Sequence, residues 1–361
     1  MEFGIFSNGF RPHTSAAETY EEDLQEIVLA DELGFKDAYI SEHHGEPPYI
    51  DRVDTIPIPE LLMCKAAGLT KQIRMGSAVK LLHIHHPLDV AIQAATTEHL
   101  IGAGRFIFGF GTGFPSPLFS EERGLTFDDR HERLKESLAF VLKCWSSKEV
   151  FDWKGSHWRG KGVVALPKPL SAPHMAMATA TDTEDIIKLS AERGYTLLSA
   201  FIEKADRLRL KADRYVDYAN AAGIVNPRKN ITASRIVYVA DTYGDAIEDL
   251  REAVTYEVGV QAERGFLKML KNAFDVEVPN GEGAIEALVD AGFYILGDPD
   301  QVAEGVRDFY EASGGFGTFL IVTGKAWATK EKRARSMIRF MEEVAPQVRN
   351  LVPSETRVSA Q

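Results

Sequence analysis

The chain has 361 residues, of which 45% are apolar and 26% charged, so it can bury a large core and is expected to be globular. Its 41 lysine and arginine residues are outnumbered by 53 acidic residues and form no basic run, which argues against nucleic acid as a partner. Two cysteines exclude a disulfide framework, and without a signal-peptide pattern or a run of about 18 apolar residues we expect a cytoplasmic protein with no membrane partner.

Short apolar runs and helical patterns alternate along the first half of the chain. Proline at the start of a run and glycine after its end, as at Pro87 and Gly102, fix the helix boundaries. The pattern predicts strands at 3–8, 36–41, 73–82 and 105–110, and helices at 17–33, 59–69, 87–101 and 127–145.

The alternation resumes in the second half after an interruption. Residues 147–174 form an insertion resembling a small hairpin, and the segment 241–297 is too long for one crossover, so we expect extra helices there. Residues 1–350 are interpreted as one domain, and 351–361 as a polar tail. The remaining predicted strands are 175–179, 195–201, 231–240 and 318–322, and the remaining helices are 184–193, 204–222 and 329–344.

A glycine followed by an aromatic residue recurs between helices and strands. The pairs are Gly34-Phe35, Gly194-Tyr195 and Gly315-Phe316. A glycine there can end the helix in the left-handed conformation, while the aromatic ring packs under the strand. Eight such β/α units predict an α/β fold, a (β/α)8 TIM barrel. A doubly wound sheet is disfavoured because residues 109–113 lack the dinucleotide-binding spacing.

The second predicted strand ends abruptly in polar residues, Ser41-Glu42-His43-His44. Because the carboxyl ends of parallel strands face the ligand crevice, these side chains are well placed for proton transfer. The alternative is structural, with one buried histidine and one at the rim.

A second histidine group, His83-Ile84-His85-His86, ends the third strand and raises the possibility of zinc. A His-x-His pair on a barrel strand can chelate zinc in a metallohydrolase. However, the later strands end without further histidine or carboxylate, and His86-Pro87 is typical of a helix start. We therefore expect no bound metal and retain a metallohydrolase only as the less favoured alternative.

Over nearly its whole length the chain resembles the luciferase-like flavin monooxygenases of the bacterial luciferase superfamily. The motifs that carry the resemblance are Met1-Glu2-Phe3-Gly4, Glu42-His43-His44, Gly76-Ser77-Ala78-Val79, Gly104-Arg105-Phe106, Phe108-Gly109, Arg130-x-x-Arg133 and Gly297-Asp298-Pro299.

The resemblance implies a specific chemistry and specific partners. It implies a two-component monooxygenase using reduced FMN and O2, via a flavin C4a-peroxide, to oxygenate a small apolar or heteroaromatic substrate. It further implies a separate NAD(P)H:flavin reductase that supplies FMNH2, and a homodimer. Two alternatives remain open, an F420-dependent oxidoreductase of the same superfamily and a flavin-binding protein without catalysis.

The resemblance also assigns the catalytic residues. Successive residues leaving a strand point to opposite sides, so only one histidine of the pair can face a flavin, and His43 matches the family's active-site histidine. An imidazole titrates near neutral pH and can act as a general acid or base. Glu42 would orient His43, and His44 is the second candidate.

The same comparison implies the cofactor contacts. The family often has a non-proline cis peptide after its third strand, here at Ala78–Val79. Thr179, Ala180, Thr181 and Asp182 precede a helix and would bind the FMN phosphate, unless Thr181-x-x-Glu184 is an ordinary capping box. Arg133, or less favourably Arg130, would supply a cation. Gly111-Thr112, which replaces a family arginine, and the charge of Asp182 depart from the family pattern and keep F420 open.

Phenylalanines at predicted strand ends could form an apolar pocket that binds substrate and excludes water. The alternative for each is the core. The candidates are Phe6, Phe10, Phe110, Phe114 and Phe201.

Overall fold

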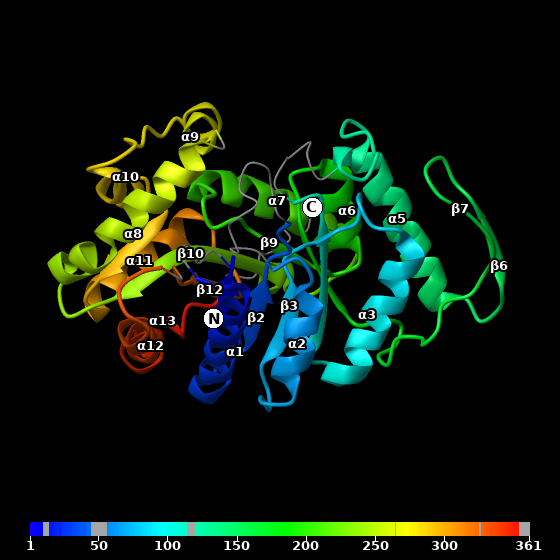
Figure 1. Ribbon diagram of the computed structural model, residues 1–361, viewed down its shortest axis with the longest axis horizontal. Helices are drawn as coiled ribbons and strands as arrows, with labels where there is room; N and C mark the ends of the chain where they lie inside the picture. Colours follow the sequence, from blue (N-terminus) through cyan, green and yellow to red (C-terminus); the bar gives the residue numbers. More distant parts are fainter. Residues whose placement is uncertain (10–13, 45–55, 114–119, 264, 325, 354–361) are drawn as a thin grey trace, which may run out of the picture. The chain divides into compact units, whose positions relative to one another are not determined.

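The computed structural model of the chain describes residues 1–9, 14–44, 56–113, 120–263, 265–324 and 326–353 (Figure 1). By its internal contacts the chain divides into two compact units. One comprises Ser7–Glu32 and Lys36–Leu198, and the other comprises Met1–Phe6, Leu33–Phe35 and Ser199–Gln361.

The unit that begins at Ser7 is built on parallel strands in the order β2-β3-β5-β8-β9, with β4 also paired to β5. All four residues of β2 are buried, as expected for a strand covered on both faces. The strands are β2 (Asp37–Ile40), β3 (Arg74–Ser77), β4 (Lys80–Leu81), β5 (Phe106–Gly111), β8 (Ala176–Ala180) and β9 (Thr196–Leu198). The helices are α1 (Ala16–Leu33), α2 (Pro59–Ala67), α3 (Pro87–Ile101), α5 (Arg130–Ser146) and α6 (Glu184–Glu192).

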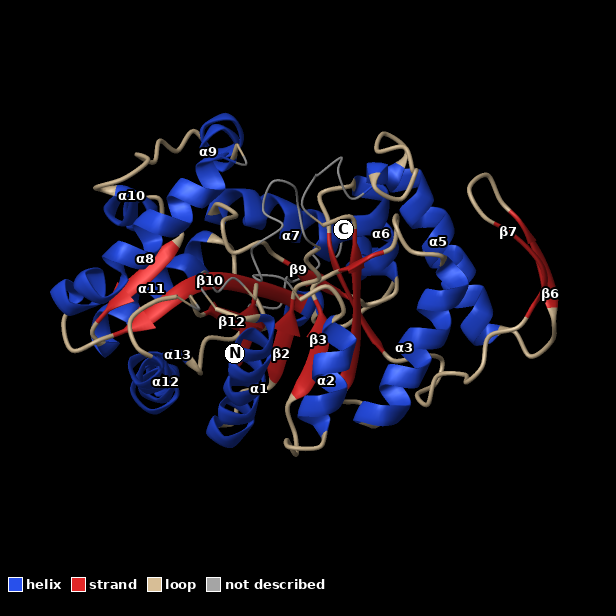
Figure 2. Ribbon diagram, viewed as in Figure 1, coloured by secondary structure: helices blue, strands red, loops and turns tan. Residues whose placement is uncertain are grey.

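The predicted hairpin insertion is confirmed. Strands β6 (Phe151–Lys154) and β7 (Arg159–Val163) pair antiparallel as a separate two-stranded sheet (Figure 2). Its turn is held to α5 by Glu136, whose carboxylate accepts hydrogen bonds from the backbone amides of Ser156, His157 and Trp158, each at 2.9 Å. The ring of Trp153 packs on Phe140 of α5, with centroids 4.9 Å apart.

The other unit contains four parallel strands in the order β11-β10-β12-β1. The strands are β1 (Glu2–Ser7), β10 (Ile231–Val239), β11 (Tyr294–Gly297) and β12 (Thr318–Val322). The helices are α7 (Ala205–Ala221), a 3₁₀ turn (Pro227–Asn230), α8 (Tyr243–Glu263), α9 (Phe266–Phe274), α10 (Ala284–Asp290), α11 (Pro299–Ala312), α12 (Lys330–Arg339), a π-helical turn (Phe340–Val344) and α13 (Ala345–Val348).

The order of elements along the chain is that of a (β/α)8 barrel, which confirms the predicted fold class. The extra helices expected within 241–297 are α8, α9 and α10. One strand, β11, lies in this segment, for which only helices are predicted, and pairs in parallel with β10. None of the described helices combines the length and the apolar composition needed to cross a bilayer.

Both cysteines carry free thiols. Cys144 is buried in α5, and burial raises the pKa of its thiol to about 11. Cys64 is partly buried in α2, where burial and the charge of Glu60 raise the pKa of its thiol.

Candidate active site

A buried carboxylate, Glu42, binds two imidazoles at the carboxyl end of β2. Its side chain is fully buried. Its Oε1 atom lies 2.8 Å from Nε2 of His44 and 2.5 Å from Nε2 of His85, which belongs to the segment between β4 and α3. The strand end therefore brings together one carboxylate and two histidines, of which His44 is 2 positions and His85 is 43 positions from Glu42 along the chain.

Two further charged side chains complete what we call the Glu42 cluster: Glu42, His44, Lys80, His85 and Glu60. The ammonium of Lys80, on β4, lies 3.3 Å from Oε2 of Glu42 and 3.6 Å from Oε2 of Glu60, near the start of α2. Lys80 is 3% exposed, so these charges interact with little screening by solvent.

The cluster sets the ionisation of its two carboxyl groups in opposite directions. Burial alone would raise the pKa of Glu42, but hydrogen bonds from His44 and His85 and the charge of Lys80 outweigh it and hold that pKa well below its usual range. For Glu60, burial dominates and raises the pKa, although Lys80 opposes the rise. Glu42 is thus the permanent negative charge of the cluster.

Glu42, His44 and His85 are also of the types that bind divalent metals, and their ligand atoms lie within 4.8 Å of one another. Zinc at its usual bond lengths would hold tetrahedral ligand atoms about 3.3 Å apart, whereas the Nε2–Oε1 separations are 2.8 and 2.5 Å. Lys80 also supplies a positive charge next to the carboxylate. The spacing fits a hydrogen-bonded cluster better than a metal centre.

The two candidate histidines at this strand end differ in their surroundings. His43 is exposed, and its backbone amide donates to the carbonyl of Ile56 at 3.2 Å. His44 is partly buried, bonded to Glu42, and its Nδ1 lies 3.5 Å from Nη2 of Arg123. Of the two, His44 is the one whose ring the structure holds on Glu42.

The predicted cofactor residues around β4 and β5 lie close together. The Ala78–Val79 peptide bond is cis, as predicted. A Cβ atom on Gly111 would come within 2.8 Å of the Val79 side chain and 2.9 Å of the Ala180 carbonyl oxygen. Thr179, which precedes Ala180 in β8, is buried, and its hydroxyl donates a hydrogen bond to the carbonyl of Phe110 at 3.0 Å. Gly111 therefore permits the backbone of β5 to lie close to the Val79 side chain and to the backbone of β8.

The predicted phosphate-binding turn precedes α6. Thr181 accepts a hydrogen bond from the amide of Thr183, and Thr183 rather than Thr181 is the N-cap residue of α6. The N-cap of α6 is Thr183, which makes no side-chain capping bond. Thr112 is partly exposed and Asp182 is exposed. The start of α6 keeps the positive end of a helix dipole next to Thr181.

The two arginines at the start of α5, Arg130 and Arg133, differ in burial and in their contacts. Arg133 is 4% exposed, forms an ion pair with Asp129, and donates to the carbonyls of Thr126 and His83. The guanidinium of Arg133 is therefore engaged within the protein. Arg130 is partly exposed, stacks on the ring of Phe127, and forms no ion pair within the described part of the chain.

The predicted aromatic pocket is met only in part. The rings of Phe6 and Phe201 are both partly buried, with centroids 6.2 Å apart. Phe110 is fully buried on the same face of β5 as Phe108, whose ring packs on Trp145 of α5, so it belongs to the core between strand and helix. The remaining two candidates, Phe10 and Phe114, lie outside the described residues.

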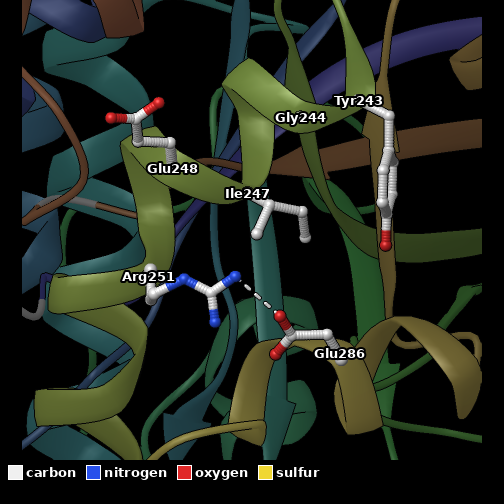
Figure 3. Close-up of a pocket in the computed structure, with 6 residues that line it drawn as sticks. All are labelled: Tyr243, Gly244, Ile247, Glu248, Arg251 and Glu286. Atoms are coloured by element: carbon white, nitrogen blue, oxygen red, sulfur yellow. Dashed lines mark ion pairs between the residues drawn. The ribbon is translucent and has the colours of Figure 1, made fainter.

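A cavity of about 400 Å³ lies between α8 and α10 (Figure 3). Arg251 and Glu286 form an ion pair of 2.7 Å within it, and both side chains are exposed. Tyr243, Gly244, Ile247 and Glu248 complete its lining. Its charged pair is exposed and its lining has no imidazole, so we place the chemistry at the Glu42 cluster instead.

The family of the chain follows from comparison with known proteins. A family model described as luciferase-like monooxygenase matches residues 1–315. The chain belongs to this luciferase-like monooxygenase family. It is 28% identical over 351 residues to limonene 1,2-monooxygenase from Rhodococcus erythropolis, covering 96% of this chain and 86% of that protein. It is 26% identical over 383 residues to 3,6-diketocamphane 1,6-monooxygenase from Pseudomonas putida, covering 96% and 98%.

A solved structure shares the fold of this luciferase-like chain. It is a type II Baeyer-Villiger monooxygenase, the oxygenating constituent of 3,6-diketocamphane monooxygenase from Pseudomonas putida, in complex with FMN. The two chains superimpose with a TM-score of 0.81 at 25% identity, covering 98% of this chain and 99% of that one. These relatives support a monooxygenase, an oxidoreductase of that general kind, for this chain.

Within this luciferase-like chain, two cluster members escape prediction from sequence. Glu60 sits in the first turn of a helix, where an acidic residue is ordinary. Lys80 carries the better signal, because a lysine inside the apolar run 73–82 must either reach solvent or find a buried partner. His85 is noted in the sequence only as a possible zinc ligand.

Proposed function

We propose that this chain is the oxygenase component of a two-component flavin monooxygenase. It would accept FMNH2 from a separate NAD(P)H:flavin reductase and use O2 to oxygenate a small organic substrate. The observation that carries the proposal is the buried Glu42 with two imidazoles on one oxygen, at a strand end where the family places its chemistry. The relatives named monooxygenases, one of them solved with FMN, support it.

The residues present fit a flavin. The side-chain atoms Ser41 Oγ and His83 Nδ1 are buried and have no hydrogen-bond partner among the described residues, so polar groups are available to a ligand. Gly111 lets β5 pass close to the Val79 side chain, which follows the cis peptide bond. The uncapped start of α6 and the guanidinium of Arg130 suit the phosphate group.

In this proposal different residues of the chain bind the phosphate group and transfer the proton. Thr179, Ala180 and Thr181, with Arg130 in place of Arg133, hold the phosphate by hydrogen bonds and charge. Reduced FMN supplies the two electrons that activate O2. An imidazole beside Glu42 takes or returns the proton that accompanies oxygen transfer. His43 is the candidate by family resemblance, and His44 is the one that contacts Glu42.

The substrate class that we propose is a terpene-like alkene or ketone. The names of two relatives indicate that they act on limonene and on a diketocamphane. The partly buried rings of Phe6 and Phe201 would suit an apolar molecule of this size. A third relative is named as the oxygenase component of a flavin-dependent trigonelline monooxygenase. Trigonelline, a pyridinium carboxylate, therefore serves as the polar substrate with which terpene-like compounds are compared.

The test supplies purified protein with FMNH2 under anaerobic conditions and then admits O2 with limonene, 3,6-diketocamphane or trigonelline. We expect tight binding of FMNH2, a single turnover of oxygenated product from the FMNH2 supplied, no flavin reduction by NADH alone, and continuous product formation from NADH only when a flavin reductase is added. Turnover with reduced F420 and no O2 consumption would refute the proposal in favour of the F420 alternative. Stoichiometric zinc in the active protein would favour the metallohydrolase.

The role of His43 is tested in the same assay. If His43 handles the proton, His43→Ala should bind FMNH2 and consume O2 but release hydrogen peroxide in place of product, with a loss of about 10²- to 10⁴-fold. Unchanged coupling would transfer the role to another imidazole. Light scattering after size-exclusion chromatography tests the homodimer that we also propose.

A further inference from the structure

The Glu42 cluster contains a histidine, His85, to which the proposed function assigns no role. Two imidazoles, those of His44 and His85, share one carboxylate oxygen. An ionised carboxylate only accepts hydrogen bonds, so both rings must carry a proton on Nε2. The two histidines therefore differ only in what happens at Nδ1.

At His44 the second nitrogen is already engaged. Its Nδ1 lies 3.5 Å from Nη2 of Arg123, and a guanidinium can only donate. The Nδ1 atom of His44 is therefore occupied by Arg123, while its Nε2 atom is bound to Glu42.

At His85 the second nitrogen is available. Among the residues that the structure describes, the hydrogen bond of His85 to Glu42 is the one that its ring makes. The side chain is 25% exposed, compared with 13% for His44. His85 thus has one nitrogen anchored on a buried carboxylate and the other open, the arrangement by which a carboxylate orients a catalytic histidine and stabilises its protonated form.

We propose that His85 is the imidazole that exchanges the proton in this chain's reaction, with Glu42 as its positioning residue. The proton is taken up at Nδ1 of His85, where an N–H bond forms as the bond from the donor breaks, and Nε2–H stays on Glu42. The same Nδ1 later returns the proton. This inference rests on the proposed monooxygenase function, and it differs from the family-based assignment to His43.

Several charged groups lie around His85. Its ring binds one oxygen of Glu42, the other oxygen of Glu42 lies 3.3 Å from Lys80, and Lys80 lies 3.6 Å from Glu60. His83, two residues away, stays neutral, because burial and the charge of Arg133 lower its pKa to about 4. His83 therefore does not compete for the proton near neutral pH.

The first experiment needs no turnover. Diethyl pyrocarbonate acylates unprotonated, accessible imidazole nitrogens, and peptide mapping by mass spectrometry locates the label on the full-length protein. We expect His85 to be labelled faster than His44 at pH 7.5, and His83 to remain unlabelled. Labelling of His44 with none on His85 would overturn the proposal.

The second experiment measures coupling in the reductase-driven assay with His85→Gln, His44→Gln and the control His99→Gln. His99 is exposed on α3, and within the described part of the chain its ring bonds to the carbonyl of Lys168, which makes it a matched change outside the cluster. His85→Gln should keep FMNH2 binding and lose about 10²- to 10⁴-fold in product formation. The pH profile of product formation should lose its acid or its base limb in His85→Gln and should keep both limbs in His44→Gln and His99→Gln.

A His85→Gln enzyme that retains product formation within about twofold of wild type would refute the proposal. If wild-type protein gives no product with any substrate, the proposed function itself fails, and the labelling experiment still decides whether His85 is the accessible ring. If His85→Gln does not fold, the labelling rates of the wild-type protein decide the question alone.

Discussion

Replacing Lys80 by methionine should destabilise the protein, because it leaves two buried carboxylates facing each other without their shared cation. Lys80 is 3% exposed and lies 3.3 Å from Glu42 and 3.6 Å from Glu60. Removing one partner of a buried ion pair costs about 3 to 5 kcal/mol. For 361 residues, with an unfolding entropy of about 2.1 cal/mol/K per residue, this lowers the melting temperature by about 4 to 7 °C.

The pH dependence identifies the cause. In wild-type protein the pKa of Glu60 is already raised, by burial first, and without Lys80 it should rise further. When the pKa of a carboxyl group is higher in the folded state than in the unfolded state, the protein loses stability as the pH rises from the unfolded-state pKa to the folded-state pKa. The Lys80→Met deficit should therefore be larger at pH 8 than at pH 5, as measured by thermal unfolding.

The control is Lys65→Met, the same change on the exposed Lys65–Glu21 pair, which should shift stability by less than about 1 kcal/mol. Adding Glu60→Gln to Lys80→Met should recover part of the lost stability. Equal melting temperatures for the two methionine variants, or a deficit that does not change between pH 5 and pH 8, would refute the reasoning.

Three further outcomes are expected from thermal unfolding and proteolysis. Gly109→Ala should cost about 3 kcal/mol or more, because its Cβ would lie 1.8 Å from the carbonyl oxygen of Ser77, whereas Gly68→Ala, at a helical φ of −72°, should stabilise by about 0.4 to 1 kcal/mol. Arg133→Ala should cost about 2 to 4 kcal/mol by leaving buried acceptors without a donor, and no loss of melting temperature would contradict its burial. Glu136→Gln should speed proteolysis of the hairpin turn at pH 7. Burial raises the Glu136 pKa but its hydrogen bonds lower it overall, so wild-type protein should lose this protection only as the pH falls below about 4.5, and equal cleavage of both proteins would contradict it.

Much of the fold could be predicted because local signals agree with the global one. Helix α3 runs from Pro87 to Ile101 as predicted, since proline and glycine bracket its apolar pattern. Strand β11 is missed because it has only four residues after a long helical segment. The pair Gly292-Phe293, directly before β11, repeats the glycine-aromatic pattern found before other strands, and Gly292 has a φ of +74°. This pattern could have predicted β11.

The candidate site could be predicted only where its residues adjoin one another in sequence. Polar residues at the end of β2 indicate Glu42 and His44, but contacts to Lys80, His85 and Glu60 depend on strand register and helix placement. The burial of Arg133 follows from helix phase: it lies four positions before Ser137, which is buried on the same face of α5. Charge alone favours the solvent for an arginine, and the pairing with Asp129 overrides that preference.

The burial of the two thiols has a consequence for oxidative damage. Peroxide attacks the thiolate, and the raised pKa values of Cys144 and Cys64 keep both thiols protonated at neutral pH. When the turnover of an oxygenase is uncoupled, hydrogen peroxide forms in its active site, so the enzyme's own thiols meet this oxidant before those of other proteins. With both sulfurs held in the unreactive form, this chain should survive many uncoupled cycles without sulfenic acid formation at either cysteine.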